Sequence, residues 1–111
     1  MKNEAMIIDY AFCTGCKSCE ISCANEKELP QGEWGIKVNE LGPKLLGGAM
    51  EWDYLAAPSR LCDLCADRRA EGAKAACELH CLADVIRIVP VEEVGAKLAE
   101  YGHDKVVVFV P

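Results

Sequence analysis

The sequence has no long hydrophobic run, no basic stripe and no nucleotide-binding glycine motif. No window of about 18 apolar residues exists, which excludes a membrane-spanning helix of ordinary length. Lysine and arginine do not cluster along the chain and the formal net charge is −6, so nucleic acid is not an expected partner. The glycines do not form G-x-G-x-x-G and no nucleophile–base set is present, so no catalytic residue is predicted.

The N-terminal segment has no charged region followed by an apolar one, and no twin-arginine pair. We therefore expect assembly in the cytoplasm, with export only alongside a partner that carries a signal. The length of 111 residues predicts a single domain over 1–111. Without a secretion signal, the eight cysteines favour metal or cluster binding over a disulfide framework.

The cysteines fall into two sets of four. The first set is Cys13, Cys16, Cys19 and Cys23. Its spacing, C-x2-C-x2-C-x3-C, is the bacterial-type run that holds iron–sulfur clusters, and the fourth cysteine of such a run typically ligates a second cluster. The second set is Cys62, Cys65, Cys77 and Cys81. Because it ends in the same C-x3-C, it supplies what the exchange requires, and the sequence predicts an electron carrier with two [4Fe–4S] clusters.

The spacing rule predicts a crossed set of ligands. Cluster 1 would be held by Cys13, Cys16, Cys19 and Cys81. Cluster 2 would be held by Cys62, Cys65, Cys77 and Cys23. The alternatives are an uncrossed assignment, in which each motif keeps its own four cysteines, and a structural zinc site. Zinc sites usually pair two C-x2-4-C knuckles across a longer gap, and several disulfides within so tight a run are geometrically poor.

The remaining pattern predicts an α+β fold with two pseudo-symmetric halves, each with a strand, a cysteine motif and a helix. Strands are expected over 6–12, 34–41, 51–55, 85–89 and 106–110, the last one buried. The second and third of these would form a hairpin inserted at about 30–61. Helices are expected over 17–28 and from Pro90 to Tyr101, with a helical turn and loop over 66–76.

Several other residues have both a functional and an ordinary interpretation. His80 precedes Cys81, but a histidine at the surface, or one that only hydrogen-bonds to sulfur, is the favoured interpretation because the ligands are already supplied. His103 is expected in solvent. Lys17, Arg68 and Arg69 could offset cluster charge or simply be solvated. Trp34 and Trp52 are either core of the hairpin or anchors for a partner.

Both motifs resemble those of a known family. The segment Cys13-Thr14-Gly15-Cys16-Lys17-Ser18-Cys19-Glu20-Ile21-Ser22-Cys23 is similar to the first cluster motif of the electron-transfer subunits of the dimethyl sulfoxide reductase (molybdopterin oxidoreductase) family. Cys62–Arg68 together with Ala76–Cys81 is similar to the last motif of the same subunits, including the eleven-residue gap. Larger members carry two further clusters between these motifs, so the resemblance implies a ferredoxin-like domain in a reduced, two-cluster form. Leu82 replaces the proline that many relatives have after the last cysteine.

The resemblance implies a partner as well as a cofactor. The chain would relay single electrons to or from a large catalytic subunit with a molybdenum or tungsten pterin, and a further redox partner or a membrane anchor protein would extend such a complex. Residues 30–61 and the aliphatic C-terminal strand would be interface candidates. The alternatives are a free two-cluster ferredoxin, which is usually shorter, and a zinc-binding structural module.

Overall fold

The computed structural model describes residues 4–102 and 105–111, so His103 lies outside the described residues. The elements, in chain order, are β1 (Glu4–Asp9), η1 (Tyr10–Phe12), α1 (Ser18–Lys27), β2 (Ile36–Leu46), β3 (Ala49–Pro58), α2 (Ala66–Ala70), α3 (Ala76–His80), β4 (Ile86–Pro90), η2 (Val91–Glu93), α4 (Val94–Tyr101) and β5 (Val106–Phe109). The predicted α+β class is confirmed. No helix within the described ranges has both the length and the apolar character needed to cross a bilayer.

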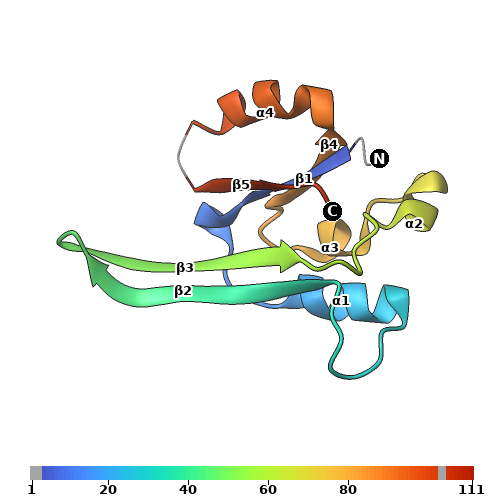
Figure 1. Cartoon of the computed structure of the whole chain (residues 1–111), viewed down its shortest axis with the longest axis horizontal. Helices are drawn as coiled ribbons and strands as arrows, with labels where there is room; N and C mark the ends of the chain where they lie inside the picture. Colours follow the sequence, from blue (N-terminus) through green and yellow to red (C-terminus); the bar gives the residue numbers. More distant parts are fainter. Residues whose placement is uncertain (1–3, 103–104) are drawn as a thin grey trace.

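The main sheet has the strand order β4-β1-β5, with β1 antiparallel to both neighbours. In the middle strand, Ala5 to Ile8 are at most 1% exposed, so β1 is covered on both faces. α4 lies over one face, where Ile7 borders a hollow shared with Tyr101 (Figure 1). The other face turns Met6 and Ile8 towards the hydrophobic core that contains the cysteines. Alternation along a single strand thus separates the α4 side from the cysteine side.

The strands β2 and β3 form the predicted hairpin, and both are longer than the sequence pattern indicated. Gly47 and Gly48 connect them, and both have positive φ (56° and 83°), as a two-residue type I′ turn requires. Figure 1 shows the hairpin reaching well beyond the rest of the molecule at its turn, while its open end lies beside α1. The base of the hairpin is therefore the part that can contribute to a site.

The helix predictions hold with small corrections. α1 ends at Lys27, before Pro30, and α4 ends where Gly102 takes a left-handed conformation (φ 71°). The predicted helix from Pro90 begins as the 3-10 turn η2, and residues 10–12, expected at the end of a strand, form the 3-10 turn η1. The five-residue helix α3 was not predicted, because most of its contacts are with α1, which is distant in sequence.

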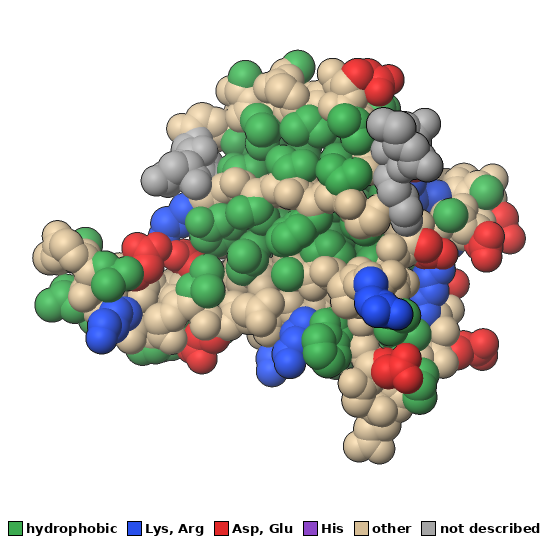
Figure 2. All heavy atoms as spheres, viewed as in Figure 1, with side chains coloured by type: hydrophobic (Ala, Val, Ile, Leu, Met, Phe, Trp, Pro, Cys, Tyr) green, Lys and Arg blue, Asp and Glu red, His purple; other side chains and the backbone are tan. Residues whose placement is uncertain are grey.

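The prediction of a buried C-terminal strand was wrong. β5 is half-buried along its whole length and Val110 is 54% exposed. The physical reason is its place at the edge of the sheet, where it pairs with β1 alone. Figure 2 shows the consequence, because apolar side chains gather on this face in the region between α4 and β3.

Candidate functional site

The structure divides the eight cysteines between two small cavities on the core side of the sheet. The first cavity is lined by four thiols, those of Cys13, Cys16, Cys19 and Cys81. The rest of its lining is mostly apolar and comes from Val38, Ala56, Ala83, Val85 and Ile86, with Thr14 and Lys17 beside them. The second motif thus contributes one thiol to a cavity formed mainly by the first.

The second cavity mirrors the first. It is lined by Cys23, Cys62, Cys65 and Cys77. Met6, Ile36, Leu64 and Ala75 complete the apolar part of the lining, and Lys27 and Asp63 lie at its border. The ion pair between these last two residues has an Nζ to Oδ1 distance of 2.6 Å. Here the first motif contributes one thiol to a cavity formed mainly by the second.

Helix α1 explains how one motif reaches both cavities. Lys17 has a left-handed conformation (φ 63°) immediately before the helix and turns the chain into it. Cys19 and Cys23 are then four residues apart on the buried face of α1, one turn from each other. One turn of helix separates the end that lies in the first cavity from the end that lies in the second.

The second motif uses the same spacing on the unpredicted helix. Cys77 lies inside α3 and Cys81 follows it directly, again four residues apart. α3 packs against α1, and Ser22 Oγ donates a hydrogen bond to the carbonyl oxygen of Ala76 at 3.3 Å. The two crossing pairs of cysteines are therefore on neighbouring helices that pack together.

Burial dominates the electrostatics of the thiols. It raises the pKa of Cys19 to about 12, and nearby Cys13 adds to the rise. Burial also raises the pKa of Cys77, with Cys65 as the next cause. Since a thiolate is the ligand form of cysteine, these sites can hold four thiolates only if positive charge shares the cavity. The donor set therefore fits a cationic cofactor.

Backbone N–H groups are directed at the sulfur atoms. The N–H of Val85 donates to Cys81 Sγ at 3.5 Å. Burial raises the pKa of Cys13, and a hydrogen bond from the backbone of Gly15 partly offsets that rise. Hydrogen bonds from Ser18, first from its side chain and then from its backbone, lower the pKa of the exposed Cys16. Such donors stabilise negative charge on sulfur.

The thiols surround space and do not converge on a point. Within residues 4–102 and 105–111, no three Cys, His, Asp or Glu side chains come together as a single-ion site would require. A cluster with several metal atoms needs its ligands spread around a cavity, whereas a tetrahedral zinc site needs them about 2.3 Å from one centre. The arrangement suits the larger group.

The base of the hairpin forms a wall of both cavities, a role that the sequence analysis missed. Ile36 lines the second cavity, and Val38 and Ala56 line the first. The N–H of Val38 donates to Glu20 Oε2 of α1 at 2.7 Å, which fixes the wall against the helix. Nothing in the local sequence pattern reveals this contact, because its two partners are 18 residues apart.

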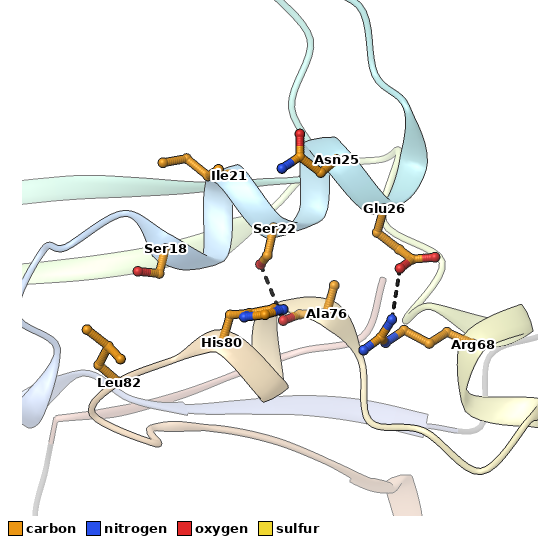
Figure 3. Close-up of a pocket in the computed structure, with 9 residues that line it drawn as sticks. All are labelled: Ser18, Ile21, Ser22, Asn25, Glu26, Arg68, Ala76, His80 and Leu82. Atoms are coloured by element: carbon orange, nitrogen blue, oxygen red, sulfur yellow. Dashed lines mark hydrogen bonds and ion pairs between the residues drawn. The ribbon is translucent and has the colours of Figure 1, made fainter.

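A wider hollow lies between α1 and α3, outside the two thiol cavities (Figure 3). His80 and Leu82 border it from one side, Ser18 and Ile21 from the other. His80 is exposed and lines neither thiol cavity, so the interpretation favoured from the sequence is confirmed. At the far end of this hollow, Arg68 pairs with Glu26 at 2.9 Å.

The other singled-out side chains have local partners or lie in solvent. Arg69 Nη1 and Nη2 donate to Glu4 Oε1 and Oε2, at 2.8 and 2.5 Å. Trp34 is 44% exposed and carries Lys37 Nζ at 4.6 Å from its ring centroid. Trp52 is 55% exposed and donates from Nε1 to Glu40 Oε2. Neither tryptophan belongs to the core.

These features define a class: a small α+β protein whose eight thiols form two groups of four in neighbouring cavities. Within that class, the sequence is similar to one component of several reductases. It is 39% identical over 61 residues to the second subunit (B) of tetrathionate reductase from Salmonella typhimurium, which is 55% of this protein and 24% of the relative. It is 35% identical over 54 residues to the corresponding component of polysulfide reductase from Wolinella succinogenes (48% and 28%).

A third relative, from Halobacterium salinarum, is described as an iron–sulfur subunit of a dimethyl sulfoxide reductase, and it is 37% identical over 38 residues (34% of this protein, 14% of the relative). The matched segments thus span between about a seventh and somewhat over a quarter of the length of these curated relatives. No family model matches the sequence. The resemblance to iron–sulfur subunits of the dimethyl sulfoxide reductase family, predicted from the two motifs, is confirmed.

Proposed function

We propose that the chain carries two [4Fe–4S] clusters and relays single electrons to or from a large catalytic subunit with a molybdenum or tungsten pterin. The observation that carries this proposal is the grouping of the thiols. Each cavity contains three cysteines of one motif and one cysteine of the other. That is the crossed set expected of two-cluster proteins with this spacing. Two single-ion sites would require no such exchange.

The residues of this chain have defined parts in the proposed relay. The clusters supply one-electron redox chemistry when bound. The thiols hold them, and the apolar linings from β1, β2, β3 and β4 exclude water. The N–H of Val85 and the neighbouring donors stabilise sulfur charge, which is one way a protein sets a cluster potential. Cys16 is exposed and Leu82 beside Cys81 is 83% exposed, so the first cavity has the shorter path to a partner.

We also propose that 1–111 is a single ferredoxin-like domain with pseudo-twofold halves. The antiparallel pairing of β1 with β4 and the packing of α1 on α3 support it, because each half contributes one strand and one cysteine-bearing helix. The distal hairpin and the edge strand β5 would contact the catalytic subunit, since both expose apolar side chains. Cytoplasmic assembly stays a prediction from the sequence.

Metal analysis of the tagged protein, purified anaerobically from its native host, tests the proposal. We expect about eight Fe per chain, as two cubanes demand. Molybdenum or tungsten on a large co-purifying polypeptide would support the subunit assignment. Eight Fe without a heavier metal would favour a free ferredoxin, and zinc without iron would refute the cluster proposal.

A further inference from the structure

The glycine at the base of the hairpin lies against a predicted cluster ligand. Gly35 directly precedes β2, is buried, and accepts a hydrogen bond at its carbonyl oxygen from the N–H of Ser59 at 2.7 Å. This bond fixes the backbone of residue 35 across the open end of the hairpin. The position of Gly35 is therefore set by the hairpin, whereas its neighbour in space, Cys23, belongs to α1.

The contact between these two residues leaves no room for a side chain. A Cβ atom added to Gly35 would overlap Cys23 Sγ, far inside van der Waals contact. The next nearest atom is Leu29 Cδ1, at 3.9 Å, an ordinary distance. The conflict is thus with the thiol sulfur itself.

The backbone conformation does not explain the glycine. Gly35 is absent from the glycines with positive φ, so an L-residue could adopt its conformation without strain. It differs in this respect from Gly15 and Gly42, which have φ values of 74° and 109°. What residue 35 contributes is the missing side chain.

Cys23 has little freedom to yield. It is 8% exposed and held on the buried face of α1, with Cys62 and Cys65 as its charged neighbours across the second cavity. A rotation that relieved a contact with residue 35 would change where the sulfur lies relative to that cavity. The thiol can thus lie in the cavity only while residue 35 has no side chain.

We propose that Gly35 is a positioning residue for cluster 2, one that allows Cys23 to act as its fourth ligand; this rests on the proposed function. By this means the hairpin, which carries no cysteine, controls the one ligand that the first motif gives to the second cluster. Gly35 does not line the cavity of cluster 1, so cluster 1 is independent of it.

The test compares Gly35→Ala with Gly95→Ala in the complete chain, purified anaerobically. Gly95 also has no positive φ and no atom within 4 Å of an added Cβ, so it is a matched control. We expect Gly35→Ala to bind about half the wild-type iron, about four Fe, because one cubane is lost. The EPR spectrum after dithionite reduction should change from that of two interacting clusters to that of one. Gly95→Ala should keep both.

A double-mutant cycle shows whether Gly35 acts through the thiol. In a Cys23→Ala background the sulfur atom is gone, so adding Gly35→Ala should cause no further loss of iron and no further shift of the urea midpoint. An equal additional loss in that background would mean that residue 35 supports only the fold, and would overturn the inference. Full iron content in Gly35→Ala would overturn it as well. Absence of iron from the wild type would refute the proposed function itself.

Discussion

At the scale of single residues, the crossing of the two motifs depends on where four cysteines lie along two short helices. Cys19 and Cys23 are one turn apart on α1, and Cys77 and Cys81 repeat that separation at α3. In both pairs, the two thiols enter different cavities. A spacing of four residues is thus enough to tie two clusters together, provided that the two helices pack.

Paired cysteine substitutions distinguish crossed from uncrossed ligation. Cys13→Ala combined with Cys81→Ala removes two thiols from the same cavity, so we expect one intact cluster and about four Fe. Cys62→Ala combined with Cys81→Ala removes one thiol from each cavity, so both clusters should be impaired. Iron analysis and EPR of the two variants provide the comparison. The reverse ranking would establish that each motif keeps its own cluster.

The ion pair between Glu4 and Arg69 predicts a pH-dependent contribution to stability. The hydrogen bond from Arg69 holds the pKa of Glu4 below its usual value of 4.5. A lowered carboxyl pKa stabilises the folded state above the unfolded pKa, and this contribution is lost as the pH falls through the folded pKa. Glu4→Gln should therefore lower the thermal midpoint at about pH 5 to 8, by the equivalent of about 1 kcal/mol or less, because the pair is partly exposed.

The difference between wild type and Glu4→Gln should shrink below about pH 4.5, the unperturbed value for glutamate. Glu33→Gln, at an exposed position in a loop, makes the same change of charge and serves as the control. A difference that grows on acidification would contradict the assignment of the pair.

At the scale of elements, the hairpin has two roles divided along its length. Its base provides walls to both thiol cavities, and its distal part exposes Leu45, Leu46, Met50 and Trp52. Tyr54 lies between these parts. Its ring packs so closely on Gly15 that a Cβ there would lie 2.8 Å from Tyr54 Cδ1. This contact braces the loop that carries Cys13 and Cys16.

Removing that ring should expose the first cluster selectively. For Tyr54→Ala we expect a loss of about 1–3 kcal/mol in stability, less than for a fully buried aromatic because Tyr54 is half-buried. About half of the visible absorbance should bleach faster in air, with the other half unchanged. Tyr54→Phe keeps the ring and should bleach like the wild type. Uniform acceleration of both halves would show that the hairpin protects the clusters only through overall stability.

The elements also show which features the sequence could predict. α1, α4, β4 and the hairpin follow from local periodicity, capping residues and turn glycines, so their existence was predictable. The thiol grouping followed from motif spacing, and the two cavities agree with it. α3, the half-buried position of β5 and the contact of Gly35 with Cys23 depend on packing between distant segments. No local pattern encodes such packing.

At the scale of the whole molecule, the cysteines are a large part of the core. Cys19, Cys23, Cys65 and Cys77 are buried in it, and the other described core residues come mostly from β1 and the hairpin base. A chain of this size has a small core, so a cofactor that fills the space between these thiols would contribute a large share of the stability. The fold and the clusters should therefore depend on each other.

Removing the iron is then expected to unfold the protein as a whole. The folded chain has a Cα radius of gyration of 14.3 Å. An unfolded chain of this length would have a radius of about 34 Å. After anaerobic treatment with ferricyanide and a chelator, small-angle scattering should show strong expansion, and the near-ultraviolet circular dichroism should disappear. The expansion should follow the loss of iron in a single transition, because Cys23 and Cys81 place each motif in both cavities. A compact iron-free protein would show instead that the apolar residues of β1, β4 and the hairpin suffice for the fold.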